Sequence, residues 1–180
     1  IVMTFLRNKM KLNVGCGARP LDGWINVDKY PVSDVVAFGD IEIGLEYPDG
    51  SFDEILLDNV IEHVDDIPKV IREIERLLRE EGEAQFITPH FSSSASWRDP
   101  THKYHLSYFS FDHLAKETTR HYFGVNQLGL VSRELSFSGG LFGLISRLVF
   151  KVSPKVWEDK WCFLLRGSTL RFRFKKLAGR

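Results

Sequence analysis

The residues whose types suggest chemistry come directly after the apolar segments in the first half of the chain. Gly15-Cys16-Gly17 follows one such segment, and Asp28, Asp40 and Asp58 follow three others. A carboxylate packed inside a protein needs a polar partner, so an acid after each segment is hard to explain by packing alone. A ligand rich in hydroxyl and amino groups explains it, and the glycine pair would let that ligand approach the backbone.

These residues belong to an alternation of strands and helices that predicts an α/β fold. Apolar runs with turn boundaries predict strands at 11–14, 24–27, 34–38, 54–57 and 83–88, and an amphipathic pattern predicts a helix at 66–80 that stops at Gly82. The segments 130–137 and 169–176 alternate apolar and polar residues, which is typical of antiparallel strands with one covered face. We therefore expect a mostly parallel sheet with an antiparallel edge and a ligand at the carboxyl ends of its strands.

The link between the first two strands argues against a dinucleotide. A dinucleotide fingerprint reads G-x-G-x-x-G and leads into a helix whose N-terminus holds the pyrophosphate. Here Pro20 stands at the third position, and the ten residues between Gly17 and Asp28 are too few for a crossover helix. We expect a ligand that has a ribose but no phosphates.

Six motifs together resemble a class I S-adenosylmethionine-dependent methyltransferase, and more closely its compact type 11-like branch. They are LNVGCG, NVD, GDIE, FDEILLDNVIEHV, LLREEGEAQFITPH and DPTHKYH, and they span about residues 11–114. The resemblance implies a Rossmann-like, mostly parallel sheet of seven strands in the order 3-2-1-4-5-7-6, with an antiparallel last strand and a reduced first helix. It also implies S-adenosylmethionine as the cofactor.

The resemblance assigns the start of the site to the loop after the first strand. Gly15, Cys16 and Gly17 match the glycine loop under the methionine and ribose portion of the cofactor, and Asp28 matches the acid that binds both ribose hydroxyls. Arg19 replaces the usual third glycine, and the first helix is reduced to ARPLDG. The Arg19 side chain is expected either to meet the cofactor carboxylate or to lie in solvent.

The same resemblance carries over to the ends of the third and fourth strands. Asp40 and Ile41 match the pair beside the adenine, with the carboxylate near the exocyclic amine. Asp58 and Asn59 match the strand end beside the amino-acid portion. His63 follows on the approach to the transferred methyl group.

Histidines supply the candidate catalytic residues. Methyl transfer from a sulfonium mainly requires alignment and exclusion of water, and a base is needed only for a hydroxyl or amine acceptor. His90, His102 and His105 lie in one segment after the fifth predicted strand. We select His102, His105 and His63; the alternative for each is a structural role, bonded to loop carbonyls. His102 and His105 also have the spacing of two metal ligands on one helical turn, but no third ligand is placed and no metal is predicted.

Charge is unevenly distributed although the formal net charge is zero. Residues 1–138 carry 14 Lys+Arg against 22 Asp+Glu, whereas residues 139–180 carry 10 against 2. The basic end is expected either to pack on the acidic body or to face an acidic substrate or a membrane surface. The apolar stretch 139–152 predicts peripheral membrane contact, a cap over the acceptor site or contact with a second subunit. No motif for nucleic-acid methylation is present, so a nucleic-acid acceptor is disfavoured.

The remaining expectations concern the chain as a whole. We predict one methyltransferase domain over 1–180, with 139–162 as a capping or inserted segment. Cys16 and Cys162 have neither a disulfide framework nor metal-ligand spacing, and without an apparent signal peptide we expect a cytoplasmic location. The predicted function is methyl transfer to a small-molecule, sugar or lipid-linked acceptor. The alternative is a non-catalytic S-adenosylmethionine-binding module that serves a partner protein.

Overall fold

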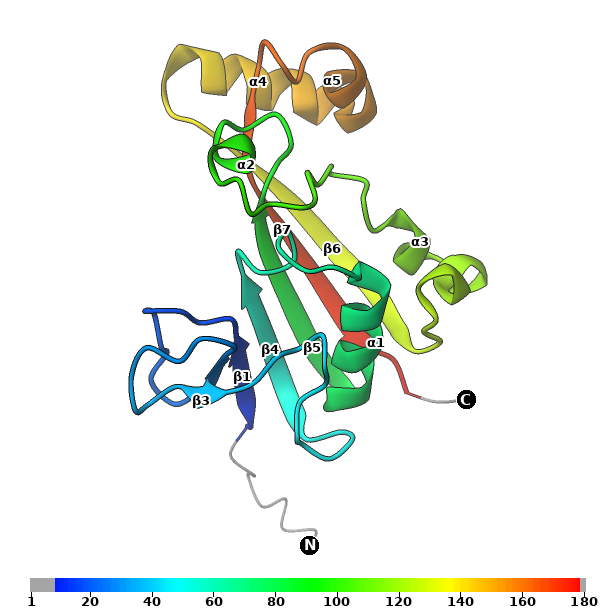
Figure 1. Cartoon of the computed structure of the whole chain (residues 1–180). Coiled ribbons are helices and arrows are strands. Elements are labelled where there is room, and N and C mark those ends of the chain that lie inside the picture. Colours follow the sequence, from blue (N-terminus) through cyan, green and yellow to red (C-terminus); the bar gives the residue numbers. More distant parts are fainter. Residues whose placement is uncertain (1–8, 179–180) are drawn as a thin grey trace, which may run out of the picture.

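The computed structural model describes residues 9–178, which build one seven-stranded sheet (Figure 1). Its strand order is β3-β2-β1-β4-β5-β7-β6, as the resemblance implies, and β7 runs antiparallel to both of its neighbours. The strands are β1 (Lys11–Val14), β2 (Ile25–Asp28), β3 (Ala37–Phe38), β4 (Phe52–Asp58), β5 (Leu78–Pro89), β6 (Leu128–Phe137) and β7 (Gly167–Lys176).

The helices occupy two places around this sheet. The first group covers one face, and the second lies beyond the carboxyl end of β5, at the top of Figure 1. The first group is α1 (Ile67–Leu77), α3 (Asp112–Ala115) and the 3₁₀ helix η1 (Glu117–Phe123). The second is α2 (Ala95–Arg98), α4 (Gly140–Val152) and α5 (Pro154–Lys160). None of the helices within residues 9–178 combines the length and apolar character needed to cross a bilayer.

Helix α1 begins where its sequence predicts but ends earlier. The Asp66 side chain accepts a hydrogen bond from the Lys69 amide at 2.9 Å, which caps the first turn. The expected stop at Gly82 is wrong: the helix ends at Leu77, and Leu78 is already extended and paired with Phe52 of β4. The strand pairing of β5 outweighs the helical spacing of the last residues, so Gly82 lies within β5.

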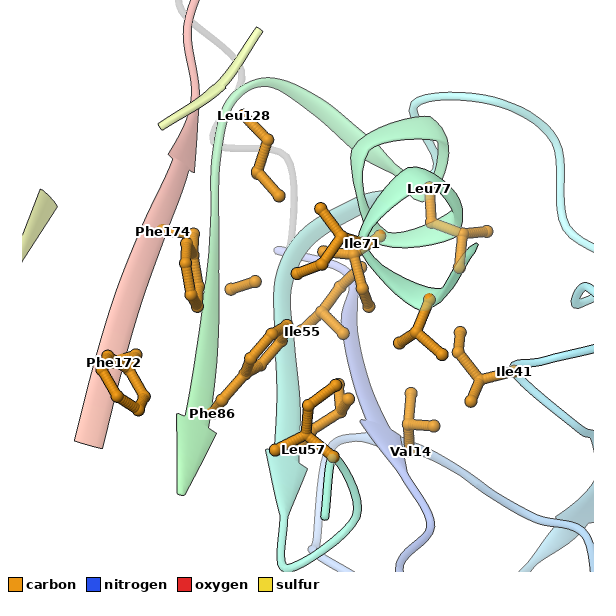
Figure 2. Close-up of a cluster of buried hydrophobic side chains, with 14 of the residues drawn as sticks. Val14, Ile41, Ile55, Leu57, Ile71, Leu77, Phe86, Leu128, Phe172 and Phe174 are labelled. Atoms are coloured by element: carbon orange, nitrogen blue, oxygen red, sulfur yellow. The ribbon is translucent and has the colours of Figure 1, made fainter. Parts of the chain in front are cut away.

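The core forms between α1 and the sheet. Figure 2 shows Ile71 and Leu77 of the helix above Ile55 and Leu57 of β4, with Phe86 of β5 beside them. All five side chains are fully buried. Burying a side chain of this kind contributes about 1.5–3 kcal/mol each, so this layer holds β1, β4 and β5 in register.

The alternation in β7 is confirmed. Phe172 and Phe174 point into the core, where Figure 2 shows them beside β5, while Arg171 and Arg173 on the other face are exposed. An antiparallel strand with one covered face gives this period of two.

Two predictions about the first half have different outcomes. Between β1 and β2 there are only turns, so the absence of a first helix is confirmed. The strand predicted at 34–38 shortens to Ala37–Phe38, and these two residues pair with Val27 and Asp28 of β2.

Helices α4 and α5 pack through a second, smaller core. Trp157, Cys162 and Leu165 are buried there against Phe137 of β6 and Phe150 of α4. The Trp157 indole donates a hydrogen bond of 3.0 Å to the Ser146 hydroxyl, which in turn donates to the Leu165 carbonyl. Helix α4 therefore packs through the buried Gly143 and Ser146 and the half-buried Val149 and Phe150, while its other apolar residues face outward.

Candidate functional site

The turn after β1 requires glycine at its first position. Gly15 has φ +64°, and a Cβ at this residue would lie 2.4 Å from Val60 Cγ2. A side chain would thus combine backbone strain with a collision. Gly17 also has a positive φ, of +52°, but a Cβ there would meet open space. The backbone of Gly15 consequently lies against the loop after β4, and the two strand ends form one wall.

Five of the predicted cofactor residues line a single cleft at the carboxyl edge of the sheet. They are Gly15, Asp28, Asp40, Ile41 and Asn59. The carboxylates of Asp28 and Asp40 belong to the same cleft, although the two residues follow different strands. The sequence analysis assigned no role to Lys29, Glu42 and Val64, which also line the cleft. Glu42 and Val64 lie inside quoted motifs and Lys29 follows Asp28, but no further signal marks any of them.

Backbone donors hold the Asp28 carboxylate in place. Gly17 N–H donates to Oδ2 at 2.8 Å, and Tyr30 N–H donates to Oδ1 at 2.7 Å. Each oxygen retains one further acceptor position. Gly17 therefore contributes to the site by orienting the Asp28 carboxylate, although Gly17 itself does not line the cleft.

The remaining predicted cofactor residues line a neighbouring hollow with Gly15. Cys16, Arg19 and Asp58 are found there, and Arg19 Nη1 lies 4.0 Å from Asp58 Oδ2. The Cys16 side chain is buried, and burial raises the pKa of its thiol, with a further contribution from the charge of Asp28. The Cys16 side chain therefore acts as a small, buried packing group in the turn after β1.

A second, more open pocket adjoins the cleft. It is lined mainly by the end of β5 and the α2 loop, through Pro89, Ala95, Arg98, Asp99, Pro100 and His102, together with Arg19, Asn59 and His63. Asn59 and His63 line both the cleft and this pocket. Asn59 has φ +55°, a left-handed conformation that asparagine tolerates better than most residues, and such strained positions gather at functional sites.

Two of the three candidate catalytic histidines come together. The rings of His63 and His102 have centroids 4.6 Å apart, and both residues line the second pocket. His105 lies elsewhere: it stacks on Trp97 with centroids 3.6 Å apart, and its Nδ1 contacts the Ser96 hydroxyl at 2.9 Å. It lines neither the cleft nor the second pocket.

Glu62 completes this pair of histidines. One donor atom from each of Glu62, His63 and His102 lies within 4.8 Å of the others, and we call these three residues the Glu62 cluster. Burial raises the pKa of Glu62, and the neighbouring Thr88 hydroxyl and the His102 imidazole only partly offset this. Burial also lowers the pKa of His63, as does nearby His102. The sequence pointed to His63 but missed Glu62, although the two residues are adjacent.

A similar set of residue types is sealed beneath α5. It consists of His90, Ser92 and Glu158, here called the His90 cluster; the first two residues are buried, and Glu158 is half-buried with a side chain that is 8% exposed. The Ser92 amide donates to His90 Nδ1 at 3.1 Å, and His90 Nε2 lies 3.5 Å from Glu158 Oε1. His90, a candidate base in the sequence, therefore reaches neither the cleft nor the second pocket.

Comparisons with known proteins agree with this arrangement. A family model described as a methyltransferase domain matches residues 25–86, from β2 to the middle of β5. That span contains Asp28, Asp40, Asn59 and the Glu62–His63 pair. No curated protein matches the sequence significantly.

Solved structures share the fold across nearly the whole chain. The YcgJ protein from Bacillus subtilis is 16% identical with a TM-score of 0.61, and the match covers 96% of this chain and 93% of that one. A SAM-dependent methyltransferase from Archaeoglobus fulgidus is 18% identical with a TM-score of 0.61, covering 93% and 86%. The [4+2]-cyclase SpnF is 16% identical with a TM-score of 0.59, covering 96% and 76%.

Identities this low show a common fold and nothing finer, and the cyclase illustrates that one fold hosts different reactions. The strand order is nevertheless the one that the resemblance implies, and the matched segment carries the residues of the cleft except Val14 and Gly15. Residues 25–86 thus match a methyltransferase domain, and the chain has the fold of S-adenosylmethionine-dependent methyltransferases, in agreement with the family and cofactor that the resemblance implies.

Proposed function

We propose that this protein transfers a methyl group from S-adenosylmethionine to a polar acceptor, a small molecule or a sugar that is free or lipid-linked. The observation that carries the proposal is the shared wall between the cleft and the second pocket, which Asn59 and His63 form. A cofactor in the cleft and an acceptor in the pocket would meet at these two residues.

The residues of the cleft fit an unphosphorylated nucleoside. The Asp28 carboxylate, held by two backbone amides, has acceptor positions left for ribose hydroxyls. Asp40 and the buried Ile41 would receive the adenine, by a polar and an apolar contact. When bound, the cofactor supplies an electrophilic methyl group on a sulfonium. The chain has to orient the acceptor and exclude water, and orientation alone can supply roughly 7–11 kcal/mol.

His63 and His102 are the residues that we assign to the acceptor. Both line the second pocket, and His63 lies at its junction with the cleft. His105, which was the third candidate, is not included because its ring stacks on Trp97 outside both hollows. A role for His63 in accepting a proton from a hydroxyl acceptor agrees with the burial that lowers its pKa, because the neutral imidazole is the basic form.

Calorimetry with S-adenosylmethionine and S-adenosylhomocysteine tests the proposal, with NADH as the control ligand. Gly15→Ala is expected to abolish cofactor binding because its Cβ would collide with Val60, whereas Gly17→Ala, with open space around the Cβ, should weaken binding less. Absence of binding to either cofactor form at millimolar concentration would remove the proposal. Cofactor binding without methyl transfer to any pooled small-molecule or glycan extract would favour the non-catalytic alternative.

The outward side of α4 supports an acceptor at a membrane surface. Leu141, Leu144, Ile145 and Leu148 recur at helical spacing, and all four are exposed. Helix α4 contains no acidic residue, and the exposed Arg147 and Lys151 lie beside this stripe. An apolar stripe flanked by cations matches an anionic lipid surface. We therefore propose peripheral contact with anionic membranes through α4, which lies at the same end of the molecule as the α2 loop (Figure 1).

Flotation with vesicles tests this contact. We expect binding to vesicles rich in phosphatidylglycerol, weak binding to pure phosphatidylcholine, and loss of binding in Leu148→Glu. Arg147→Glu should lower binding to the anionic vesicles only. If light scattering instead shows a dimer that Leu148→Glu dissociates, without vesicle binding, the stripe is an interface between copies of the chain and the membrane assignment is wrong.

A further inference from the structure

We propose that Glu62, His63 and His102 form a binding site for a divalent transition-metal cation at the junction of the cleft and the second pocket. The sequence predicted no metal, because His102 and His105 were the pair with ligand spacing and no third donor was placed. The fold supplies a different set, in which His105 has no part.

The donor set is compact and comes from two separate segments. One donor atom of each residue lies within 4.8 Å of the other two. A cation with bonds of about 2.1 Å holds its donors roughly 3.4 Å apart, so small side-chain rotations would close the set. The loop that carries His102 is fastened to the other segment, because the amides of Lys103 and Tyr104 both donate to the Glu62 carbonyl, at 2.8 and 3.1 Å.

The hydrogen bonds of the two imidazoles leave the same nitrogen free. His102 Nδ1 lies 2.9 Å from the Ser96 carbonyl, which can only accept, so this nitrogen carries the proton. His63 Nδ1 faces the Thr101 carbonyl at 3.3 Å and its hydroxyl at 3.0 Å, and that hydroxyl already donates to Asp99. Both rings therefore have an unprotonated Nε2. Metal-binding histidines are oriented in this way, with one nitrogen bonded to a carbonyl or other acceptor and the other on the metal.

The state of Glu62 is an independent observation that points to a ligand. Its side chain is fully buried, and neither carboxylate oxygen has a hydrogen-bond partner among the described residues 9–178. The Thr88 hydroxyl, which is itself without a partner there, lies close enough to lower the pKa of Glu62 but offsets the effect of burial only in part. A buried carboxylate without partners is costly, and proteins stabilise one by pairing or by coordinating a metal. A cation between Glu62 and the two histidines would satisfy it.

The donor chemistry selects the kind of cation. Two imidazoles and one carboxylate suit Zn²⁺, Mn²⁺ or Co²⁺ and disfavour Mg²⁺ and Ca²⁺, which prefer oxygen ligands. Three protein ligands leave a coordination position open, and His63 and His102 both line the second pocket. If the proposed function is correct, an oxygen atom of the acceptor would occupy that position when the cation is bound, and His63 would accept a proton only in the metal-free protein; the cation site itself depends on neither role.

The test uses chelator-stripped protein without a histidine tag and without cofactor. Titration with Co²⁺ should give visible absorption bands at a stoichiometry of one, and Zn²⁺ should displace the Co²⁺. Glu62→Gln and His102→Ala should each weaken Zn²⁺ binding in calorimetry by at least about 100-fold. His105→Ala, three residues away in the same loop, should bind like the parent protein.

Three results would overturn the site: no binding at millimolar metal, binding that Glu62→Gln leaves unchanged, or equal losses in His102→Ala and His105→Ala. Circular dichroism of each variant verifies that it is folded, and Glu62→Gln retains the side-chain shape. Titration with S-adenosylhomocysteine in the presence of chelator tests cofactor binding separately. A failure of the proposed function is thereby distinguished from a failure of the metal site.

Discussion

The Glu62 cluster and the His90 cluster contain the same kinds of residue and lie in different surroundings. Each combines imidazole with a carboxylate near the end of β4 or β5. His90 is fully buried beside Trp157, with ring centroids 5.4 Å apart, while His63 and His102 line a pocket. The carboxylates differ in degree: within residues 9–178 neither oxygen of Glu62 has a hydrogen-bond partner, whereas Glu158 leaves only Oε2 without one and places Oε1 3.5 Å from His90 Nε2.

The difference teaches that residue type does not separate a binding site from a structural contact. In the His90 cluster both nitrogens are directed at the protein: Nδ1 accepts from the Ser92 amide, and Nε2 faces Glu158. Ser92 Oγ also accepts from the Gly167 amide at 3.0 Å, which joins this cluster to β7. The His90 cluster therefore joins α5 to the sheet, whereas the Glu62 cluster borders a pocket and holds a carboxylate without a hydrogen-bond partner within residues 9–178.

The largest expected effect is on stability and separates the two clusters. His90→Ala should lower the free energy of unfolding by about 2–4 kcal/mol, because it leaves a cavity beside Trp157 and orphans polar partners. His102→Ala should cost less than about 1 kcal/mol, since its ring borders a pocket. Urea unfolding of both variants in chelator measures the difference. Equal losses would mean that the Glu62 cluster is also structural.

A smaller effect of opposite sign is expected at Glu62. In chelator, Glu62→Gln should raise the free energy of unfolding by about 1–2 kcal/mol, because it removes the cost of burying an unpaired carboxylate. Burial raises the pKa of Glu62 above its value in the unfolded chain. The free energy of unfolding of the parent protein therefore falls as the pH rises through the folded pKa of Glu62, because the buried carboxyl group becomes charged. The gain should therefore be present near about pH 8 and absent near about pH 4. Urea unfolding at both values measures it; a loss of stability near the higher pH would show that Glu62 is already compensated within the chain.

The smallest expected effect is on metal affinity and follows from losing the hydroxyl group that orients His63. Thr101→Val keeps the shape of the side chain but removes the hydroxyl that lies 3.0 Å from His63 Nδ1. We expect Co²⁺ affinity to fall about 10-fold, as is usual when a group that orients a ligand is lost. Absorption titration against the parent protein checks this, and Ser93→Ala, in the α2 loop without a contact to either histidine, is the matched control. Unchanged affinity in Thr101→Val would mean that the carbonyl alone orients His63.

Much of the fold could be predicted from local patterns. The apolar spacing of α1 and the alternation of β7 report which side of each element is buried, and both readings are confirmed. The end of α1 could not be predicted in this way, because Leu78 satisfies the helical pattern and is extended only through its pairing with Phe52. Strand pairing is a contact between distant segments, and it overrides a local preference.

The residues of the candidate site also divide into those that local patterns could predict and those that depend on contacts between distant segments. Asp28 and Asp40 could be identified because they stand at the end of β2 and just after β3, and parallel strands bring such residues to one edge. Glu62 could not, because its adjacency to His63 says nothing about burial or about missing hydrogen-bond partners. Trp97 likewise gave no sign that it would hold His105 away from the pocket.

By itself the sequence determined the order and type of the main elements, the glycine turn after β1 and two acids, Asp28 and Asp40, that line the cleft. These follow from spacing along the chain, since periodicity and strand ends are local properties. Only the tertiary structure decided that Glu62 and His63 meet His102, and that His90 is sealed under α5. The reason is physical: burial, and the distance between side chains on separate segments, are set by how the elements pack against each other.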